Sequence, residues 1–375
     1  MRRDIEAIVS QQRGIIFATP AIVHREQYSG RDIIAKNSAF ASGYTDGRGY
    51  VPVEWWIMSI TEAENAKKKD GEGLTMLQVG KQQVSLQAAN EEMHFFNPAR
   101  WPLTKILDIG GEPRETSFGS REVPPIPPHV HSGNVIDGKM TGPGKLEAYF
   151  FPPTEKIRDT VITRLGVKKG VTKDDVKQRL TRFGKDDSMY ELLQEYVVRP
   201  YDCWTIPAGT LHAPGPWVTV EIQLPQDDFN LAGWRLAERT SDRELYETMV
   251  LRGLKDEEEF AAQAINWETT SDNDFEKNNR RTIEVLAQGA WGRRYRIFFG
   301  TFYGEGWEIK AGHEITFEKR RAVGGVLWEG SGLINGNHLG TAQREFLSVA
   351  HNIHIAAERD LTIFTVEEMR DERHH

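Results

Sequence analysis

The C-terminal part of the chain is built from short β-like segments at a regular spacing, and this feature limits the fold more than any other. From residue 282 onward, apolar and polar residues alternate in short runs that end at turn residues, as in GWEIKAG (306–312) and REFLSVA (344–350). Each such run can bury one face and then turn back onto its neighbour, which is typical of an all-β barrel or sandwich. We therefore expect a β barrel over residues 282–375.

The rest of the chain carries a second β region and two helical regions. Residues 1–125 contain β-like runs such as EWWIMSI (54–60), separated by turn signals. Residues 154–196 instead carry apolar residues at three- and four-residue spacing, which predicts a helical insertion. We predict three parts, which are an N-terminal β domain over 1–235 that contains this insertion, a helical linker over 236–281, and the C-terminal barrel.

Composition and charge argue against several classes of protein. A chain of 375 residues with a formal net charge of −8 and no long basic block is not expected to bind nucleic acid. No apolar segment approaches the length of a membrane span, and the run at 14–23 is interrupted by Pro20. The single cysteine, Cys203, rules out an internal disulfide framework and fits a reducing compartment. We expect a soluble cytoplasmic protein that does not bind membranes. Whether it forms a homodimer is left open.

Four residues on separate β-like runs have the chemistry of a metal site. His129 and His131 alternate along a strand, so both side chains project from one face. Glu147 follows Lys145 at the same alternation after a Gly-rich turn, and His212 lies in the later run IPAGTLHAPG. Three imidazoles and one carboxylate suit Zn²⁺, Mn²⁺, Fe²⁺, Co²⁺ or Ni²⁺. A His-x-His pair alone is more often surface or packing decoration, but the joint pattern favours a metal site.

The same motifs resemble those of a known superfamily. HVH, GKLE and IPAGTLH are similar to the two sequence motifs of the cupins, whose double-stranded β-helix barrel holds a divalent metal. The chain looks more specifically like the class I mannose-6-phosphate isomerases, in the Gly-Lys-x-Glu signature at 144–147, the helical segment at 165–180 and the run at 207–223. This resemblance implies a mainly β fold of two cupin (jelly-roll) barrels with a helical insertion. It also implies one metal, with Zn²⁺ as the first candidate, in the first barrel only.

The resemblance also assigns residues. The metal ligands would be His129, His131, Glu147 and His212. The family usually has Gln where this chain has His129, and this departure leaves the identity of the metal open. The family also uses an arginine after the EIQ run, but the candidate here, Arg235, is not in clean register. Whether the substrate carries a phosphate therefore stays open.

The activity that the resemblance implies is an aldose–ketose isomerase acting on a sugar or sugar phosphate through an enediolate. Lys145 is a candidate for stabilising the enediolate or transferring the proton, although it could simply pair with Glu147. Glu221 and Arg235 are the other catalytic candidates. Two alternatives stay open, a metal-dependent cupin dioxygenase with redox-active iron or copper, and a sugar-binding cupin without catalysis.

Overall fold

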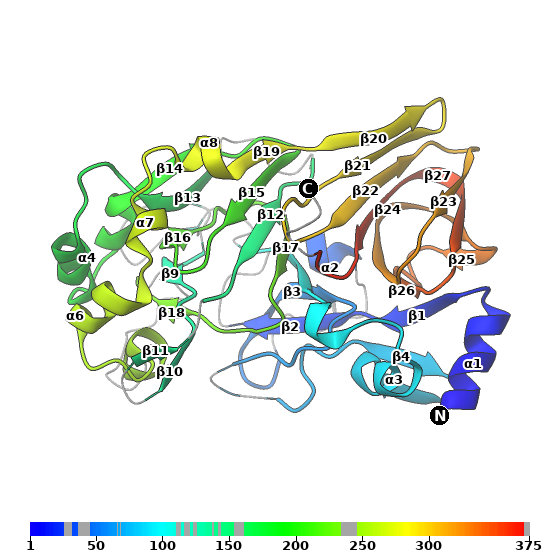
Figure 1. Cartoon of the computed structure of the whole chain (residues 1–375), viewed down its shortest axis with the longest axis horizontal. Coiled ribbons are helices and arrows are strands. Elements are labelled where there is room, and N and C mark those ends of the chain that lie inside the picture. The colour runs from blue at the N-terminus through cyan, green and yellow to red at the C-terminus, as the bar shows by residue number, and fades with distance from the viewer. Residues whose placement is uncertain are drawn as a thin grey trace.

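Short strands with turns between them make up most of the protein. The computed structural model describes residues 1–25, 32–36, 46–65, 67, 69–109, 114–115, 121–122, 126–136, 139–141, 144–153, 161–233 and 246–370. Within these residues the strands form three large antiparallel sheets (Figure 1). The prediction of a mainly β fold is confirmed.

The largest sheet belongs mostly to the C-terminal region. It has eleven strands, of which eight come from that region: β20 (Glu284–Gly289), β21 (Gly292–Arg296), β22 (Gly304–Ile309), β23 (Glu314–Glu318), β24 (Val323–Ile334), β25 (Asn337–Leu339), β26 (Glu345–Ser348) and β27 (Asn352–Val366). The other three are β1 (Ile15–Thr19), which pairs with β26, β4 (Met76–Val79) and β5 (Gln82–Ser85). The N- and C-terminal regions of the chain therefore share one sheet.

Two smaller sheets contain the histidine and glutamate motifs. The seven-stranded sheet consists, in spatial order, of β19 (Arg280–Thr282), β15 (Asp202–Ile206), β12 (Glu147–Phe150), β17 (Thr219–Gln223), β6 (Leu103–Leu107), β3 (Val51–Ile57) and β2 (Ala21–Arg25). The five-stranded sheet consists of β14 (Leu193–Val197), β13 (Ile162–Val167), β16 (His212–Ala213), β9 (His129–Val130) and β18 (Asn230–Leu231). Side chains of β16 and β12 approach to 2.9 Å, so the two sheets face each other at these motifs. Two small ribbons complete the strands, β7 (Arg114–Glu115) with β8 (Arg121–Glu122), and β10 (Asn134–Ile136) with β11 (Lys139–Thr141).

The helices are short, and several of them lie toward the two ends of the molecule, whereas α2 (Asp32–Lys36) lies near its middle (Figure 1). One end has α1 (Arg2–Gln11) and α3 (Leu86–Met93), and the other has α4 (Lys173–Leu180). Helix α4 begins at Thr172, whose hydroxyl accepts from the backbone of Asp175 while the Asp175 carboxylate accepts from the backbone of Thr172. The remaining helical segments are η2 (Pro98–Arg100), η3 (Ser188–Leu192), η4 (Tyr246–Leu251), α6 (Glu257–Glu259), η5 (Phe260–Ala264), α7 (Trp267–Thr270) and α8 (Phe275–Asn279). In the described part of the chain, no helix has the length and apolar character that crossing a membrane requires.

The predicted helical insertion at 154–196 is only partly helical. Its segment 162–167 forms β13 and its last residues belong to β14, and these two strands pair with each other. Apolar spacing suggested a helix there, but β13 also pairs with β16, so partners in the sheet decide the conformation. The stretch 246–279 does form helical turns, although buried residues such as Phe260 pack it into a core instead of leaving it as an exposed linker. The domain boundaries themselves stay a prediction.

One aromatic core joins the two halves of the molecule. Phe150 on β12 lies in ring contact with Tyr295 on β21 and with Phe364 on β27. All three rings are buried in one cluster, and each such burial stabilises the fold by roughly 1.5–3 kcal/mol. Cys203 is buried in the same cluster, where burial raises the pKa of its thiol, so the interpretation of this cysteine as a packed residue is confirmed.

Candidate metal centre and its pocket

The sheet pairing brings the three histidines of the motifs together. His212 on β16 lies directly opposite His129 on β9, and His131 follows β9 by one residue. The ring centroids of His129 and His212 are 4.1 Å apart, and the ring of His131 lies 5.0 and 5.2 Å from them. One nitrogen from each ring lies within 4.8 Å of the other two, so the three side chains could hold one metal ion.

Backbone carbonyls orient all three rings in the same way. The Nδ1 atoms of His129, His131 and His212 lie 2.7, 2.6 and 2.7 Å from the carbonyl oxygens of Pro127, Asp228 and Thr210. A carbonyl only accepts, so each Nδ1 carries the hydrogen, and each Nε2 of a neutral ring presents a lone pair to the centre. Burial lowers the pKa of both His129 and His131, which favours the neutral rings that metals bind.

Glu147 adds a carboxylate to the three imidazoles, and neither its oxygens nor the Nε2 atoms that face them carry a hydrogen. Its Oε2 lies 3.1 Å from Nε2 of His131, and its Oε1 lies 2.9 Å from Nε2 of His212. Within the described residues, neither Oε2 of Glu147 nor Nε2 of His212 has a hydrogen-bond partner, although both are buried. Lone pairs that face each other in a buried site repel unless a cation lies between them, so these four residues fit a divalent metal.

Close backbone contacts fix the distances between the three motif segments. The carbonyl oxygen of His131 accepts from the backbone N–H of Gly209 at 3.0 Å. A Cβ added to Gly144 would lie 1.7 Å from the same oxygen, so a side chain there would push the segment that carries Glu147 away. Gly209 itself has φ +76°, a conformation that glycine adopts readily. Gly144 and Gly209 thus let the GKLE and PAGTLH segments both approach the backbone of His131.

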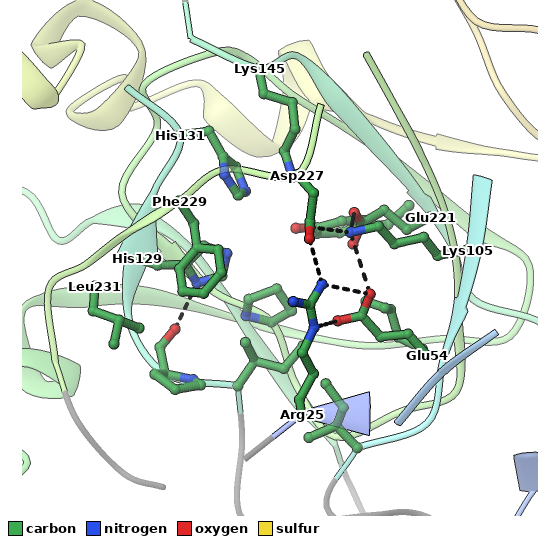
Figure 2. Close-up of a pocket in the computed structure, with 16 residues that line it drawn as sticks. Arg25, Glu54, Lys105, His129, His131, Lys145, Glu221, Asp227, Phe229 and Leu231 are labelled. Carbon is green, nitrogen blue, oxygen red and sulfur yellow. Dashed lines mark hydrogen bonds and ion pairs between the residues drawn. The ribbon is translucent and has the colours of Figure 1, made fainter. Parts of the chain in front are cut away.

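A pocket opens beside the histidines (Figure 2). It contains about 540 Å³ of empty space, including its open mouth. One side of the pocket is apolar and includes Phe229 and Leu231, whereas the opposite side carries Arg25, Glu54, Lys105, Lys145, Glu221 and Asp227.

The polar side is a row of ionisable residues across adjacent strands of the seven-stranded sheet. Glu221 on β17 lies opposite Tyr149 on β12 and Lys105 on β6. Glu54 on β3 and Arg25 on β2 continue the row, with Arg25 Nε donating to Glu54 Oε1 at 2.8 Å. The loop residue Asp227 closes it by accepting from Arg25 Nη2 at 2.8 Å and from Lys105 Nζ at 3.3 Å. We call these five residues (Arg25, Glu54, Lys105, Glu221 and Asp227) the charged row.

Burial changes the proton affinity of one member of the charged row. Burial raises the pKa of Glu221 to about 7, and the nearby charge of Glu147 adds to the effect, while Lys105 acts against it. The Lys105 ammonium lies 3.8 Å from Oε1 of Glu221. A carboxyl with a pKa near neutrality can both accept and release a proton under physiological conditions, which is the property of a general acid–base group.

The sequence located part of this site. The structure brings His129, His131, Glu147 and His212 together and places Lys145 and Glu221 in the same pocket, whereas Arg235 lies outside the described residues. Sequence reasoning missed Arg25, Glu54, Lys105 and Asp227. For Lys105 and Glu54 the signal was a lone charged residue in an otherwise apolar strand, LTKIL (103–107) and VPVEWWI (51–57), both of which are buried throughout.

A second group of metal-binding residue types has a different role. His24, Asp46 and Glu72 lie close enough together to be compared with a metal site. Arg48 donates to the carboxylates of both Asp46 and Glu72, at 2.8 Å and at 2.6 and 2.7 Å. The guanidinium already supplies the positive charge, so this group is an ion-pair cluster.

Comparisons with known proteins give a fold. No protein-family model matches the sequence, and no curated protein matches it. Among solved structures, mannose 6-phosphate isomerase from Bacillus subtilis matches with a TM-score of 0.64 and 16% identity over 94% of this chain and 99% of that chain. A mannose 6-phosphate isomerase bound with zinc and yttrium matches with a TM-score of 0.60 and 11% identity over 95% and 99%. A variant of phosphomannose isomerase from Salmonella typhimurium gives 0.60 and 11% over 95% and 100%. The resemblance noted in the motifs thus extends to nearly the whole chain, which has the cupin-type fold of the mannose-6-phosphate isomerases.

Proposed function

We propose that the protein is a metal-dependent aldose–ketose isomerase, with His129, His131, Glu147 and His212 as the ligands of one divalent cation. The observation that carries the proposal is the meeting of imidazole and carboxylate lone pairs at 2.9 and 3.1 Å, beside a pocket that Lys145 and Glu221 line. The likeness in fold to the mannose-6-phosphate isomerases supports a sugar as the substrate.

Zn²⁺ is our first candidate for the cation, because three nitrogens and one oxygen are a common zinc donor set. Mn²⁺, Fe²⁺, Co²⁺ and Ni²⁺ suit the same donors. When bound, such a cation supplies a Lewis acid that polarises a sugar carbonyl and holds the vicinal oxygen.

The residues of the pocket supply the proton transfers. In an aldose–ketose conversion, a base removes the proton from C2 of the aldose and an acid returns a proton to C1, while the hydroxyl proton moves from O2 to O1. Glu221, with its pKa near 7, is our candidate for the group that carries the carbon-bound proton. Lys145, whose Nζ donates to Gln223 at 2.8 Å and lies 3.4 Å from Glu147 Oε2, provides a fixed cation beside the developing enediolate.

The alternatives differ in what the pocket must hold. A cupin dioxygenase would need redox-active iron or copper and an apolar substrate, and the charged row on one wall favours a polyol instead. A sugar-binding protein without catalysis would share the pocket, and turnover distinguishes the two. Arg235 as a catalytic residue, the cytoplasmic location and a homodimer stay predictions from the sequence.

The test is a substrate panel on metal-loaded protein. We expect interconversion of an aldose and its ketose, followed by proton NMR in D₂O, with exchange of the carbon-bound proton at C1 or C2. The Glu221→Gln variant should bind metal normally and lose at least about 100-fold in kcat, because proton transfer by a positioned group contributes that much. Metal-loaded protein that converts no sugar and instead consumes oxygen would contradict the proposal.

A further inference from the structure

The cations in the pocket are already neutralised. Among the described residues that line it, the cationic side chains are Arg25, Lys105 and Lys145. Lys105 Nζ has three carboxylates within 4 Å, those of Asp227 at 3.3 Å, Glu54 at 3.5 Å and Glu221 at 3.8 Å. Lys145 is held by Gln223 and by the proposed ligand Glu147. Neither ammonium group is therefore free to serve a second anion.

Arg25 has no hydrogen-bond donor left for a ligand. Its Nε donates to Glu54, and its Nη2 donates to both Glu54 and Asp227. Its Nη1 donates to the carbonyl oxygen of Glu64 at 2.9 Å and to Oδ1 of Asn65 at 3.0 Å. A guanidinium has five N–H donors, and these five contacts use all of them. Arginine forks are the usual partners of phosphate, and this one is occupied within the protein.

The remaining wall does not suit an anion either. Phe229 and Leu231 lie on the side of the pocket opposite Glu54 and Lys105 (Figure 2). A phosphate dianion can only accept hydrogen bonds, so it would meet the carboxylates of the charged row as a like charge and the apolar wall without partners. A sugar hydroxyl both donates and accepts, and the C–H face of a sugar ring can pack on an apolar wall.

We infer that the pocket takes a sugar without a phosphate group, a free aldose and its free ketose. This inference rests on the proposed isomerase function and narrows its substrate class. It separates this chain from the solved neighbours named as mannose 6-phosphate isomerases, whose fold it shares at 11–16% identity. The charged row then binds sugar hydroxyl groups through its carboxylate oxygens, which accept hydrogen bonds.

The experiment compares each sugar with its own phosphate ester on the metal-loaded full chain. Free hexoses and pentoses and their terminal phosphates are assayed for interconversion in parallel. We expect kcat/KM for the free sugar to exceed that for its ester by about 100-fold, because like charges held together in a binding site are strongly disfavoured. An ester with an equal or higher kcat/KM overturns the inference and leaves the isomerase proposal standing.

Loss of all turnover would instead count against the proposed function, and binding then decides the substrate class. Calorimetric titration with the same pairs should give heat for free sugars and none for their esters. Tighter binding of an ester overturns the inference in this case too.

A substitution at the apolar wall tests the cause. Phe229 is only partly buried, so Phe229→Arg can add an unpaired cation to the pocket, and Phe229→Leu is its matched control. We expect the ratio of ester to free-sugar kcat/KM to rise about 10-fold in Phe229→Arg relative to Phe229→Leu. An unchanged ratio in a folded Phe229→Arg protein would show that the pairing of Arg25, Lys105 and Lys145 within the protein is not what excludes the phosphate.

Discussion

Two buried glutamates, one in each half of the molecule, have opposite surroundings. Glu147 on β12 faces the Nε2 lone pairs of His131 and His212, and its Oε2 lacks a hydrogen-bond partner among the described residues. Glu305 on β22 is equally buried, but it accepts from donors on every side, which are Arg294 Nε and Nη2, Tyr303 Oη, Trp307 Nε1 and Lys319 Nζ. The carboxylate in the first half is open to a cation, whereas the one in the second half is already satisfied.

The comparison shows how similar local patterns serve different ends. In each case an aromatic residue two positions further along the strand donates to the glutamate, Tyr149 to Glu147 and Trp307 to Glu305. The other neighbours decide the outcome, because imidazole lone pairs leave a place for a metal and N–H donors do not. A buried carboxylate can thus bind a metal where imidazole lone pairs face it, as at Glu147, even though the ammonium of Lys145 lies 3.4 Å from its Oε2.

The largest effect is expected from removing one of the two imidazole rings whose lone pairs face Glu147. His131→Ala should reduce the metal content of protein purified without chelators from about one equivalent per chain to less than about a tenth, because a three-donor site holds the ion far more weakly. Mass spectrometry of the metal content measures this. His354→Ala is the control, since this partly buried histidine pairs with Glu314 in the C-terminal region. Equal metal content in His131→Ala and the wild type would refute the ligand assignment.

A substitution of the second glutamate, Glu305, should lower the free energy of unfolding and leave the metal content unchanged. Glu305→Gln removes the counter-charge of Arg294 and one counter-charge of Lys319, and buried pairs broken on one side cost roughly 3–5 kcal/mol of unfolding free energy. Urea unfolding measures the loss, with Glu6→Gln as the control at an exposed pair with Arg2. Loss of metal from Glu305→Gln, without loss of stability, would contradict the assignment of Glu305 to stability and Glu147 to metal binding.

The sequence predicted the residues around Glu147 better than it predicted the charged row. Strand alternation predicted that His129 and His131 share a face, and the resemblance of HVH, GKLE and PAGTLH to the cupin motifs grouped Glu147 and His212 with them. The charged row depends instead on which strands become neighbours in the sheet, and local pattern does not fix this. The same limit explains β13, whose apolar spacing suggested a helix until its pairing with β14 and β16 was known.

A third buried carboxylate, Glu345, contacts only uncharged donors among the residues that the structure describes. It accepts from Trp55 Nε1 at 2.8 Å, Met58 N at 2.7 Å and Thr75 Oγ1 at 3.3 Å, and burial raises its pKa to about 7. A carboxyl of the unfolded chain has its pKa near 4.5, so between pH 4.5 and 7 the folded protein binds the extra proton. Its contribution to stability is therefore fully present below pH 4.5 and is lost as the pH rises through 7.

Unfolding at two pH values measures this loss. The wild type should lose roughly 3 kcal/mol more than Glu345→Gln between pH 4.5 and pH 8, since each pKa unit corresponds to about 1.4 kcal/mol. Glu305 has the opposite sign, because Arg294 and Lys319 outweigh burial and lower its pKa to about 2, so its contribution is lost only in acid. Parallel pH profiles for the wild type and Glu345→Gln would show that folding does not raise the pKa of Glu345.

The smallest effect is expected where the helical segment supports the open site. The hydroxyl of Thr270 on α7 accepts from the backbone of Leu211, next to His212, and the backbone N–H of Asn266 donates to Gly209 in the same loop. Thr270→Val removes two buried hydrogen bonds, the one from Leu211 N and the one to the carbonyl of Gly209, each of which contributes about 1 kcal/mol. The substitution should weaken metal binding by roughly 10-fold by loosening the histidine. Ser271→Ala is the control, because that exposed hydroxyl donates within its own helix, to the carbonyl of Trp267. Competition with a chelator measures the affinity. If both variants retain the wild-type metal affinity, α7 does not help to position His212. The strand β16 alone then does so.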